Sequence, residues 1–277
     1  MRPRPKGMNK SQVLSKSIFR RFAYPKPGSH KGQNGIILVI GGSAKYHGAP
    51  FLAMLAASRF CDLAFFYSPA KENRQIANAI KPKLFEFIGI SKNELGEHMA
   101  WADCILIGNG MENSKETRKL AISVLKTGKR CVLDAGALYP GILPHLHKNA
   151  LATPHSGEFK RLFGMEASPA AVEKCAKKHG CTILCKTPAC DIISDGKRTM
   201  LNLAGAPGMT HGGTGDVLAG LACAFCATQK TVFESACMAA LLNGIAGEAL
   251  AEKSGPSIRA SDLADALGPV LYILAKK

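Results

Sequence analysis

The first 61 of the chain's 277 residues contain no Asp or Glu, although they contain 11 Lys and Arg residues. Over the whole chain, 36 Lys and Arg stand against 20 Asp and Glu, which gives a formal net charge of +16. A basic excess of this kind attracts anionic partners. Charged residues make up only 20% of the chain and hydrophobic residues 47%, so a disordered basic tail is excluded and a globular protein is predicted.

Long apolar runs and paired cysteine motifs are also missing. The uncharged stretches between Asp216 and Lys230 and between Glu234 and Glu248 fall short of the roughly 20 residues that a membrane-spanning helix needs. The ten cysteines have no partner pair or His at zinc-finger spacing, so we predict reduced thiols in a cytoplasmic protein. No aromatic platform accompanies the basic start, which disfavours a nucleic-acid binder.

Residues 1–25 form a basic extension with two interpretations. Its composition is that of an organellar transit peptide, because it is acid-free and rich in Arg, Lys and Ser. Its apolar residues Val13, Leu14, Ile18, Phe19 and Phe22 also suit an N-terminal helix that packs on the domain and keeps its basic face in solvent. We favour the helix.

Strand-like and helix-like segments alternate along most of the chain. Continuous apolar runs predict strands covered on both faces at 36–40, 63–67, 84–88, 104–107, 131–133 and 182–186. Helices are predicted at 49–61, 115–126, 170–179, 215–227, 232–252 and 262–275, and Ser168, Pro169 and Gly180 supply start and stop signals for the third. A hairpin is predicted at 192–203, around Asp195-Gly196. The pattern predicts one α/β domain over 1–277, with a mainly parallel sheet, helices on both faces and an antiparallel edge hairpin.

A glycine-rich loop leads directly into an apolar helix near the C-terminus. It reads Gly212-Gly213-Thr214-Gly215-Asp216. Free backbone N–H groups and the positive end of the helix dipole would meet there, which is typical of a phosphate site, and Asp216 could accept a proton from a substrate hydroxyl. The loop lacks the Gly-Lys-Ser/Thr of a P-loop, and Gly41-Gly42 completes no GxGxxG fingerprint, so a Rossmann dehydrogenase is poorly supported.

Other candidates lie in loops, and a loop that follows a strand is where ligands bind in open α/β sheets. His155 comes after a Thr-Pro pair and could donate a hydrogen bond as a neutral imidazole, or pair with phosphate when protonated. Asp134 ends an apolar strand, and Glu158 is interpreted as a helix-terminal acid. His30 and Lys31, in a segment flanked by glycine, are candidate phosphate contacts, with a solvated surface as the equal alternative.

Together these segments resemble the NAD(P)H-hydrate dehydratases of the ribokinase-like superfamily. The resemblance runs from about Ser29 to the C-terminus. It is carried by Ser29-His30-Lys31-Gly32, the segment 38–43, Gly48-Ala49-Pro50, Ile107-Gly108-Asn109-Gly110, Leu133-Asp134-Ala135, the segment 153–159 and the Gly215-Asp216 block. Each piece is common by itself, but their order and spacing are specific.

The resemblance implies a lyase in which a nucleotide phosphorylates the hydroxyl of hydrated NADH or NADPH and phosphate then leaves. It implies Asp216 as the base, ADP or ATP as donor with Mg²⁺, and a homo-oligomer, with a tetramer among the options. Substrate contacts would be Ala49, Gly110, His155 and Asp216. Nucleotide contacts would be Lys186, Thr187, Pro188, Ala189, Cys190 and Gly215, beside an anion hole of Gly212, Gly213, Thr214 and Gly215. No protein ligands for a metal are assigned.

Two questions stay open at this stage. The chain departs from the family pattern at Thr187 and Cys190, which leaves the choice between ADP and ATP open, with ADP favoured. A small-molecule kinase acting on a vitamin-precursor alcohol is the alternative, since it would use the same loop and Asp216. The separate epimerase domain of fused family members has no room in this chain, so no epimerase activity is expected.

Overall fold

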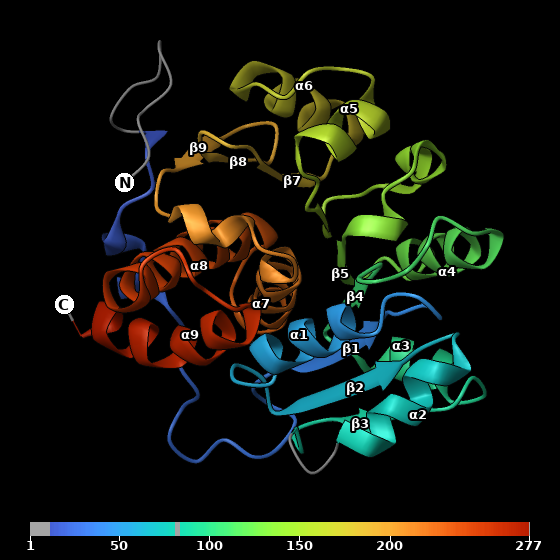
Figure 1. The fold of residues 1–277 in the computed structure, drawn as a ribbon. Coiled ribbons are helices and arrows are strands. Elements are labelled where there is room, and N and C mark those ends of the chain that lie inside the picture. The colour runs from blue at the N-terminus through green and yellow to red at the C-terminus, as the bar shows by residue number, and fades with distance from the viewer. Residues whose placement is uncertain (1–11, 81–83, 277) are drawn as a thin grey trace.

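A nine-stranded sheet lies between two layers of helices in the computed structural model, which describes residues 12–80 and 84–276 (Figure 1). The strands are β1 (Ile36–Ile40), β2 (Leu63–Tyr67), β3 (Ile88–Gly89), β4 (Cys104–Ile107), β5 (Arg130–Leu133), β6 (Ala150–Ala152), β7 (Thr182–Lys186), β8 (Asp191–Ser194) and β9 (Thr199–Asn202). They are ordered β3-β2-β1-β4-β5-β6-β7-β8-β9. The strands from β1 to β7 pair in parallel, whereas β8 and β9 add an antiparallel hairpin at the edge. The predicted fold is confirmed.

Helices cover both faces of the sheet, as parallel strands require. One layer holds α1 (Gly48–Ala57), α2 (Lys71–Ile80), α7 (Thr214–Thr228), α8 (Val232–Ser254) and α9 (Ala260–Ala275). The other holds α3 (Leu95–Trp101), α4 (Lys115–Lys126), α5 (Ser156–Phe163) and α6 (Pro169–His179). Short 3₁₀ turns are η2 (Lys16–Arg21), η3 (Ala135–Ala137), η4 (Pro140–His145) and η5 (Pro207–Thr210). The start and stop signals of α6 act as predicted, because Ser168 caps its first turn and Gly180 ends it in the left-handed conformation.

The strand predicted at 84–88 is wrong. Strand β3 is only Ile88–Gly89, and Leu84 and Phe87 instead pack into the same core cluster as α1. Two buried side chains three positions apart lie on one side of an irregular segment, whereas a strand would alternate them. Four elements were not predicted in full: β6 is only three residues long, α2 and α3 are polar and short, and of α5 only the start, at Glu158, was expected.

The basic N-terminal segment packs on the domain, as favoured, although its helical part is the 3₁₀ turn η2 rather than an α-helix. Phe19 is 1% exposed, and Val13 forms an isolated bridge with Leu201 at the end of the sheet. The basic residues Arg20 and Arg21 lie exposed. Residues 1–11 of the extension lie outside the described residues.

All ten cysteines are free thiols, and nine of them are buried. Burial raises the pKa of the least buried one, Cys61, to about 12, with the nearby Asp62 carboxylate adding to the effect. In the described part of the chain, no helix has the length and apolar character to cross a bilayer.

Arg130 fixes the far end of α7. Its guanidinium donates hydrogen bonds to the backbone carbonyls of Cys226 (2.6 Å), Gln229 (2.8 Å) and Lys230 (2.8 Å). These carbonyls have no intrahelical partner, and the positive charge of Arg130 also interacts favourably with the negative end of the helix dipole. Asp216 lies in the first turn, at the opposite end of α7. Arg130 therefore helps to fix the position of the helix that carries Asp216.

Replacing Arg130 by Met is expected to lower the free energy of unfolding by about 2 kcal/mol, since hydrogen bonds from a charged donor are each worth about 1.5–3 kcal/mol. Urea unfolding followed by circular dichroism measures this. Arg130→Lys keeps the charge but not the planar fork, so we expect an intermediate loss. An unchanged unfolding midpoint in Arg130→Met would show that the three carbonyls are solvated equally well without the guanidinium.

Candidate active site

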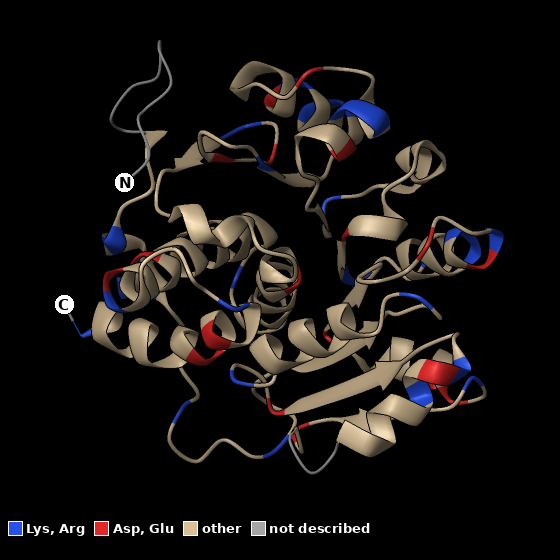
Figure 2. Cartoon of the chain, viewed as in Figure 1, with Lys and Arg blue, Asp and Glu red and all other residues tan. Residues whose placement is uncertain are grey.

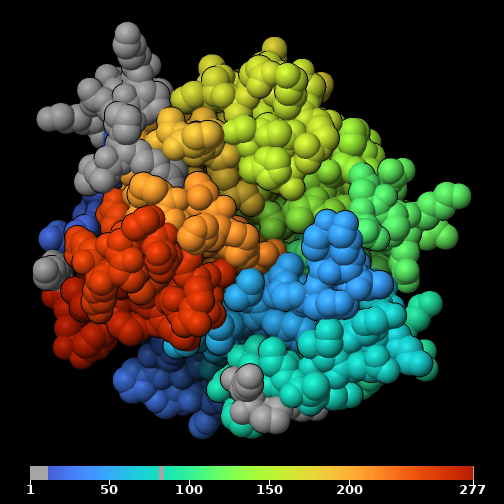
Figure 3. Space-filling view, viewed as in Figure 1, coloured from blue at the N-terminus to red at the C-terminus, as the bar shows by residue number. Residues whose placement is uncertain are grey.

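Five loops and one helix start meet at the carboxyl edge of the sheet. The loops follow β1, β4, β5, β6 and β7, and α7 begins above them (Figure 1). The chain passes from β1 to β2 on one side while β4 lies on the other, so the strand order reverses between β1 and β4, where ligands bind in open sheets. In the space-filling view, the α1 start and the segment leading into α7 meet on one face, although they are far apart in sequence (Figure 3).

The loops after β1 and β4 pack tightly against the start of α1. A Cβ atom added at Gly110 would lie 3.0 Å from the Cβ of Ala49, so these two predicted substrate contacts are neighbours. Gly108 has a φ of +118°, and a Cβ there would lie 1.8 Å from the carbonyl oxygen of Asp134. Only glycine fits this position, which brings the loops after β4 and β5 into contact.

Asp134 lies at the centre of a buried polar network. It is 3% exposed, and its carboxylate accepts hydrogen bonds from Asn109 Nδ2 (3.0 Å), Thr153 Oγ1 (2.7 Å) and Lys186 Nζ (3.0 Å). The three donors come from the ends of three other strands or their loops. A buried carboxylate is stable only with such partners, so the network fixes these side chains relative to one another.

Asp216, in the first turn of α7, joins this network through Asn109, whose Nδ2 donates a hydrogen bond of 2.6 Å to its Oδ1. Burial raises the pKa of Asp216 to about 6. The hydrogen bond from Asn109 opposes this rise, the Asp134 charge adds to it, and Lys186 opposes it. A carboxyl group with a pKa near 6 can hold or release a proton close to neutral pH, as general base catalysis requires.

Lys186, the last residue of β7, supplies the positive charge of the site. Burial opposes its charge, but the carboxylates of Asp134, Glu158 and Asp216 outweigh burial and raise the pKa of Lys186. Its ammonium therefore stays charged. A Cβ at Gly215 would lie 3.6 Å from Nζ, so the ammonium lies beside the first turn of α7.

The start of α7 leaves backbone donors open. Its N-cap is Gly213, which has a φ of +96° and offers no side chain for capping. A Cβ at Gly213 would lie 2.4 Å from Leu52 and 2.9 Å from Ala260, so the glycine also lets α1 and α9 approach. The first N–H groups of a helix lack intrahelical partners, and the helix dipole adds positive potential. The predicted anion hole therefore has the geometry of an anion site, next to Lys186.

His155 caps α5 rather than facing solvent freely. Its Nδ1 accepts hydrogen bonds from the N–H groups of Gly157 (3.0 Å) and Glu158 (3.3 Å), and the Glu158 carboxylate accepts one from the His155 N–H (2.9 Å). Glu158 is thus the helix-terminal acid that was predicted. Because Nδ1 is an acceptor, the ring proton of the neutral imidazole is on Nε2, which leaves Nε2 as a donor.

A pocket of about 570 Å³ extends from this network past the start of α7. Its lining includes His155, Lys186, Thr187, Pro188, Thr214 and Gly215 among the predicted residues. Ala189 and Cys190 do not line it, and Cys190 is 1% exposed. Ala49, Gly110 and Asp216 are not among its lining residues. Apart from His155, a predicted substrate contact that lines this pocket, the predicted nucleotide and substrate residues therefore fall into two groups.

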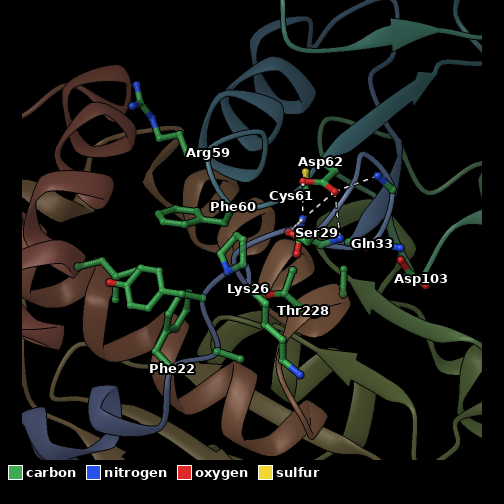
Figure 4. A pocket seen from close by; sticks show the side chains of 18 of the residues that line it. Phe22, Lys26, Ser29, Gln33, Arg59, Phe60, Cys61, Asp62, Asp103 and Thr228 are labelled. Carbon is green, nitrogen blue, oxygen red and sulfur yellow. Dashed lines mark hydrogen bonds between the residues drawn. The ribbon is translucent and has the colours of Figure 1, made fainter.

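A larger pocket of about 830 Å³ lies at the opposite, amino-terminal edge of the sheet (Figure 4). In this pocket, the Asp62 carboxylate accepts hydrogen bonds from the N–H groups of Gly32 (2.9 Å) and Asn34 (3.0 Å). This carboxylate therefore already binds the protein's own backbone. His30 and Lys31 belong to this edge, because they precede β1, whereas Asp216 lies beyond its far end. Five strand residues span about 16 Å, so His30 and Lys31 lie far from Asp216, and their exposure favours the alternative of a solvated surface.

Charge does not single out the site at the level of the whole molecule. Lys and Arg residues lie scattered over the outer helices and loops in the view of Figure 2. Within residues 12–80 and 84–276, no cluster of three or more His, Cys, Asp and Glu side chains is arranged to hold a metal ion. A magnesium ion carried on nucleotide phosphates needs only one or two carboxylates.

Sequence reasoning missed the residues that join the site together. Asn109 links the two carboxylates, and Thr153 supports Asp134, yet neither was given a chemical role, although both lie in segments that carry the family resemblance. Their positions directly after β4 and β6 could have identified them, because polar residues at the carboxyl ends of buried parallel strands face the ligand crevice. Strand β6 itself was not predicted, which hid Thr153.

Comparison with known proteins gives a consistent result. The family model described as NAD(P)H-hydrate dehydratase matches residues 37–269. An ADP-dependent (S)-NAD(P)H-hydrate dehydratase from Cenarchaeum symbiosum is 42% identical over 261 residues, which cover 88% of this chain and 90% of that relative.

Solved structures give the same fold. A ribokinase-like superfamily protein from Enterococcus faecalis has a TM-score of 0.86 at 24% identity, over 99% of this chain and 100% of that one. An ADP/ATP-dependent NAD(P)H-hydrate dehydratase from Bacillus subtilis, co-crystallized with ATP and Mg²⁺, has a TM-score of 0.84 at 23% identity, over 95% and 98%. The fold is therefore ribokinase-like, and the family match over most of the sequence shows that the chain belongs to the NAD(P)H-hydrate dehydratase family.

Proposed function

We propose that the protein restores NADH and NADPH from their hydrates in a nucleotide-dependent reaction. The observation that carries this proposal is the position of Asp216, a carboxylate with a pKa near 6 at the mouth of an open helix start. A general base beside an anion site suits transfer of a phosphoryl group to a hydroxyl. The similarity to an ADP-dependent dehydratase over most of both chains supports ADP as the donor.

In the proposed reaction, the Asp216 carboxylate accepts the proton of the ring hydroxyl. The hydroxyl oxygen forms a bond to the terminal phosphorus of ADP, and AMP leaves. The ring C–O bond then breaks and phosphate departs with the bonding electrons, the adjacent ring carbon loses a proton to water, and the new C=C bond restores the reduced dinucleotide. Substrate would lie beside Ala49 and Gly110, with His155 donating from Nε2 at the boundary between the two groups of residues. These roles rest on the family resemblance and, for Gly110, on its neighbour Asn109, which donates a hydrogen bond to Asp216.

The nucleotide would occupy the pocket of about 570 Å³. Its phosphates would lie at the start of α7, where the N–H groups at Gly215 and Asp216 and the Lys186 ammonium stabilise negative charge. Thr187 and Pro188 would line the nucleoside, whereas Ala189 and Cys190 would act only through the shape of this loop. Bound Mg²⁺ would neutralise charge on the phosphates, held by them and by at most one or two carboxylates.

The direct test supplies hydrated NADH with ADP or with ATP and follows the return of NADH absorbance. Recovery with ADP is expected, and the ATP arm shows whether the donor choice is strict. Folded protein that restores no NADH with either nucleotide would refute the proposal. A small-molecule kinase, the alternative, would instead consume nucleotide in the presence of an alcohol and leave a stable phosphorylated product.

The rate should depend on pH through Asp216. A base must be deprotonated, so kcat/KM should fall as pH drops through about 6. Asn109→Ala removes the hydrogen bond that stabilises the Asp216 carboxylate, and such a bond to a charged group is worth about 1.5–3 kcal/mol. Since one pKa unit corresponds to about 1.4 kcal/mol, the midpoint should rise by roughly one to two pH units.

Profiles of kcat/KM between pH 5 and 9 measure this shift. The difference between the variant and the wild type is the test, because phosphate groups of the nucleotide titrate near pH 6 as well and are common to both. Coincident profiles would show that Asn109 does not control the ionisation of Asp216.

The homo-oligomer and the single-domain organisation remain predictions. Light scattering of the purified protein would decide the first. Limited proteolysis would decide the second, since a single domain should lose only its ends before it unfolds.

A further inference from the structure

The pocket beside Lys186 has two chemically different ends. At one end lie the α7 start and the Lys186 ammonium, which suit phosphate. The rest of the wall is mostly apolar, and it is formed by the exposed Pro188 and Pro207 and by the more buried Ala206, Met209 and Leu218. Flat apolar walls of this kind suit the faces of a nucleotide base. One amide side chain, that of Asn243, lies among them.

Asn243 lies about one helical turn deeper than the anion site. Helices α7 and α8 pack together and are joined by residues 229–231 only, so they run antiparallel. At 1.5 Å per residue, Asn243 lies about as far from this connection along α8 as Leu218 does along α7. Leu218 is one turn below the α7 start, which places Asn243 about 5 Å deeper than Gly215 along the helix.

The Asn243 amide is buried and incompletely bonded. The residue is 5% exposed, and its Oδ1 has no hydrogen-bond partner within the described residues. It is held in place by close packing, because a Cβ on the adjacent Gly244 would lie 2.5 Å from the Ala204 carbonyl oxygen. A buried carbonyl oxygen without a donor is unfavourable, and a ligand that supplies an N–H group would relieve this.

We propose that Asn243 selects adenine among the nucleotide bases, with Oδ1 accepting a hydrogen bond from the 6-amino group. This inference rests on the proposed function, because it assumes that the pocket holds the phosphoryl donor. Asn pairs with adenine through two adjacent hydrogen bonds, since the amide NH₂ also donates to a ring nitrogen. A 6-oxo base such as hypoxanthine places an acceptor against Oδ1 instead.

ADP and IDP differ at the 6-position and the adjoining ring nitrogen, so they form a matched pair. With wild-type protein and hydrated NADH, we expect the KM for IDP to exceed that for ADP by roughly tenfold to a hundredfold, at similar kcat. Asn243→Leu keeps the volume of the side chain but loses both polar groups. Its KM for ADP should rise to that for IDP, within about threefold.

Two further variants separate base selection from damage to the pocket. Asn243→Ala repeats the test without a bulky side chain, in case the leucine prevents folding. Pro188→Ala alters an exposed wall residue that cannot read the base, so it should change the KM for ADP and IDP by the same factor. Inorganic pyrophosphate, which reaches only the phosphate end, should inhibit wild type and Asn243 variants equally.

The outcomes are distinguishable. Wild-type protein that uses ADP and IDP equally well would overturn the role of Asn243 while leaving the dehydratase reaction intact. A preference for ADP that persists in Asn243→Leu or Asn243→Ala would overturn it too. Failure of the wild type to restore NADH with ADP, ATP or IDP would instead refute the proposed function itself.

Discussion

Replacing Asp216 by Asn is expected to lower kcat for NADH recovery by a factor of about 10²–10⁴, the range typical for loss of a general base. The amide has nearly the same shape and can still accept the hydrogen bond from Asn109. It cannot take up the proton of the ring hydroxyl. The nucleotide KM should change much less, because the α7 backbone and Lys186 remain.

The same substitution is expected to stabilise the protein at alkaline pH. Burial raises the pKa of Asp216 from 3.8 to about 6, so the folded protein binds this proton more tightly than the unfolded chain does. Its contribution to stability is therefore most favourable below pH 4 and declines as pH rises from about 4 to 6. Above pH 6 the charged, buried carboxylate costs up to about 3 kcal/mol, which Asp216→Asn would recover.

Steady-state kinetics and urea unfolding at pH 4.5 and pH 8 test both statements on one sample. The gain in stability should appear at pH 8 and shrink at pH 4.5. Glu116→Gln is a matched control, since Glu116 is an exposed acid in the first turn of α4. We expect it to leave kcat unchanged. Full activity in Asp216→Asn would exclude this residue as the base.

The second large effect is expected for Lys186→Met. This change leaves the Asp134 carboxylate, which is 3% exposed, without its cation. Removing one partner of a buried ion pair typically destabilises a protein by about 3–5 kcal/mol. At about 2–4 °C per kcal/mol for a protein of this size, the Tm should fall by roughly 10 °C. Loss of the cation should also raise the pKa of Asp216 and weaken nucleotide binding.

A double variant distinguishes an unpaired charge from a simple packing defect. Asp134→Asn combined with Lys186→Met removes both charges, and the amide introduced in place of the carboxylate can still accept hydrogen bonds from its neighbours, so most of the lost stability should return. Calorimetry of the four proteins gives the coupling energy. If the double variant is as unstable as the sum of the two single variants, the pair is not coupled and the network does not depend on it.

The residues that sequence reasoning found are those whose role follows from local chemistry. Ser168 and Gly180 delimit a helix through their own hydrogen bonds and backbone angles, and Gly213 and Asp216 define a helix start with its acid. Such features depend on a few adjacent residues. Strands buried on both faces are likewise apparent as apolar runs, which is why β1, β2 and β4 have their predicted bounds.

The parts that could not be predicted depend on contacts between distant segments. The hydrogen bonds of Asn109 to Asp134 and Asp216 join residues 25 and 107 positions apart. Asn243 lies in an apolar helix, and nothing in the sequence indicates that it reaches a pocket. The short β6 and β3 exist because neighbouring strands pair with them, as their own sequences carry little preference.

The burial of the cysteines has a practical consequence for fluorescence labelling. Maleimide reagents react with exposed thiolates, and here nine thiols are buried while the tenth, Cys61, has a pKa of about 12. The native chain should therefore behave toward such reagents almost as a cysteine-free protein. A single cysteine introduced on the exposed surface of α4 could carry a dye without removal of the natural ones, and would allow nucleotide binding to be followed in otherwise unaltered protein.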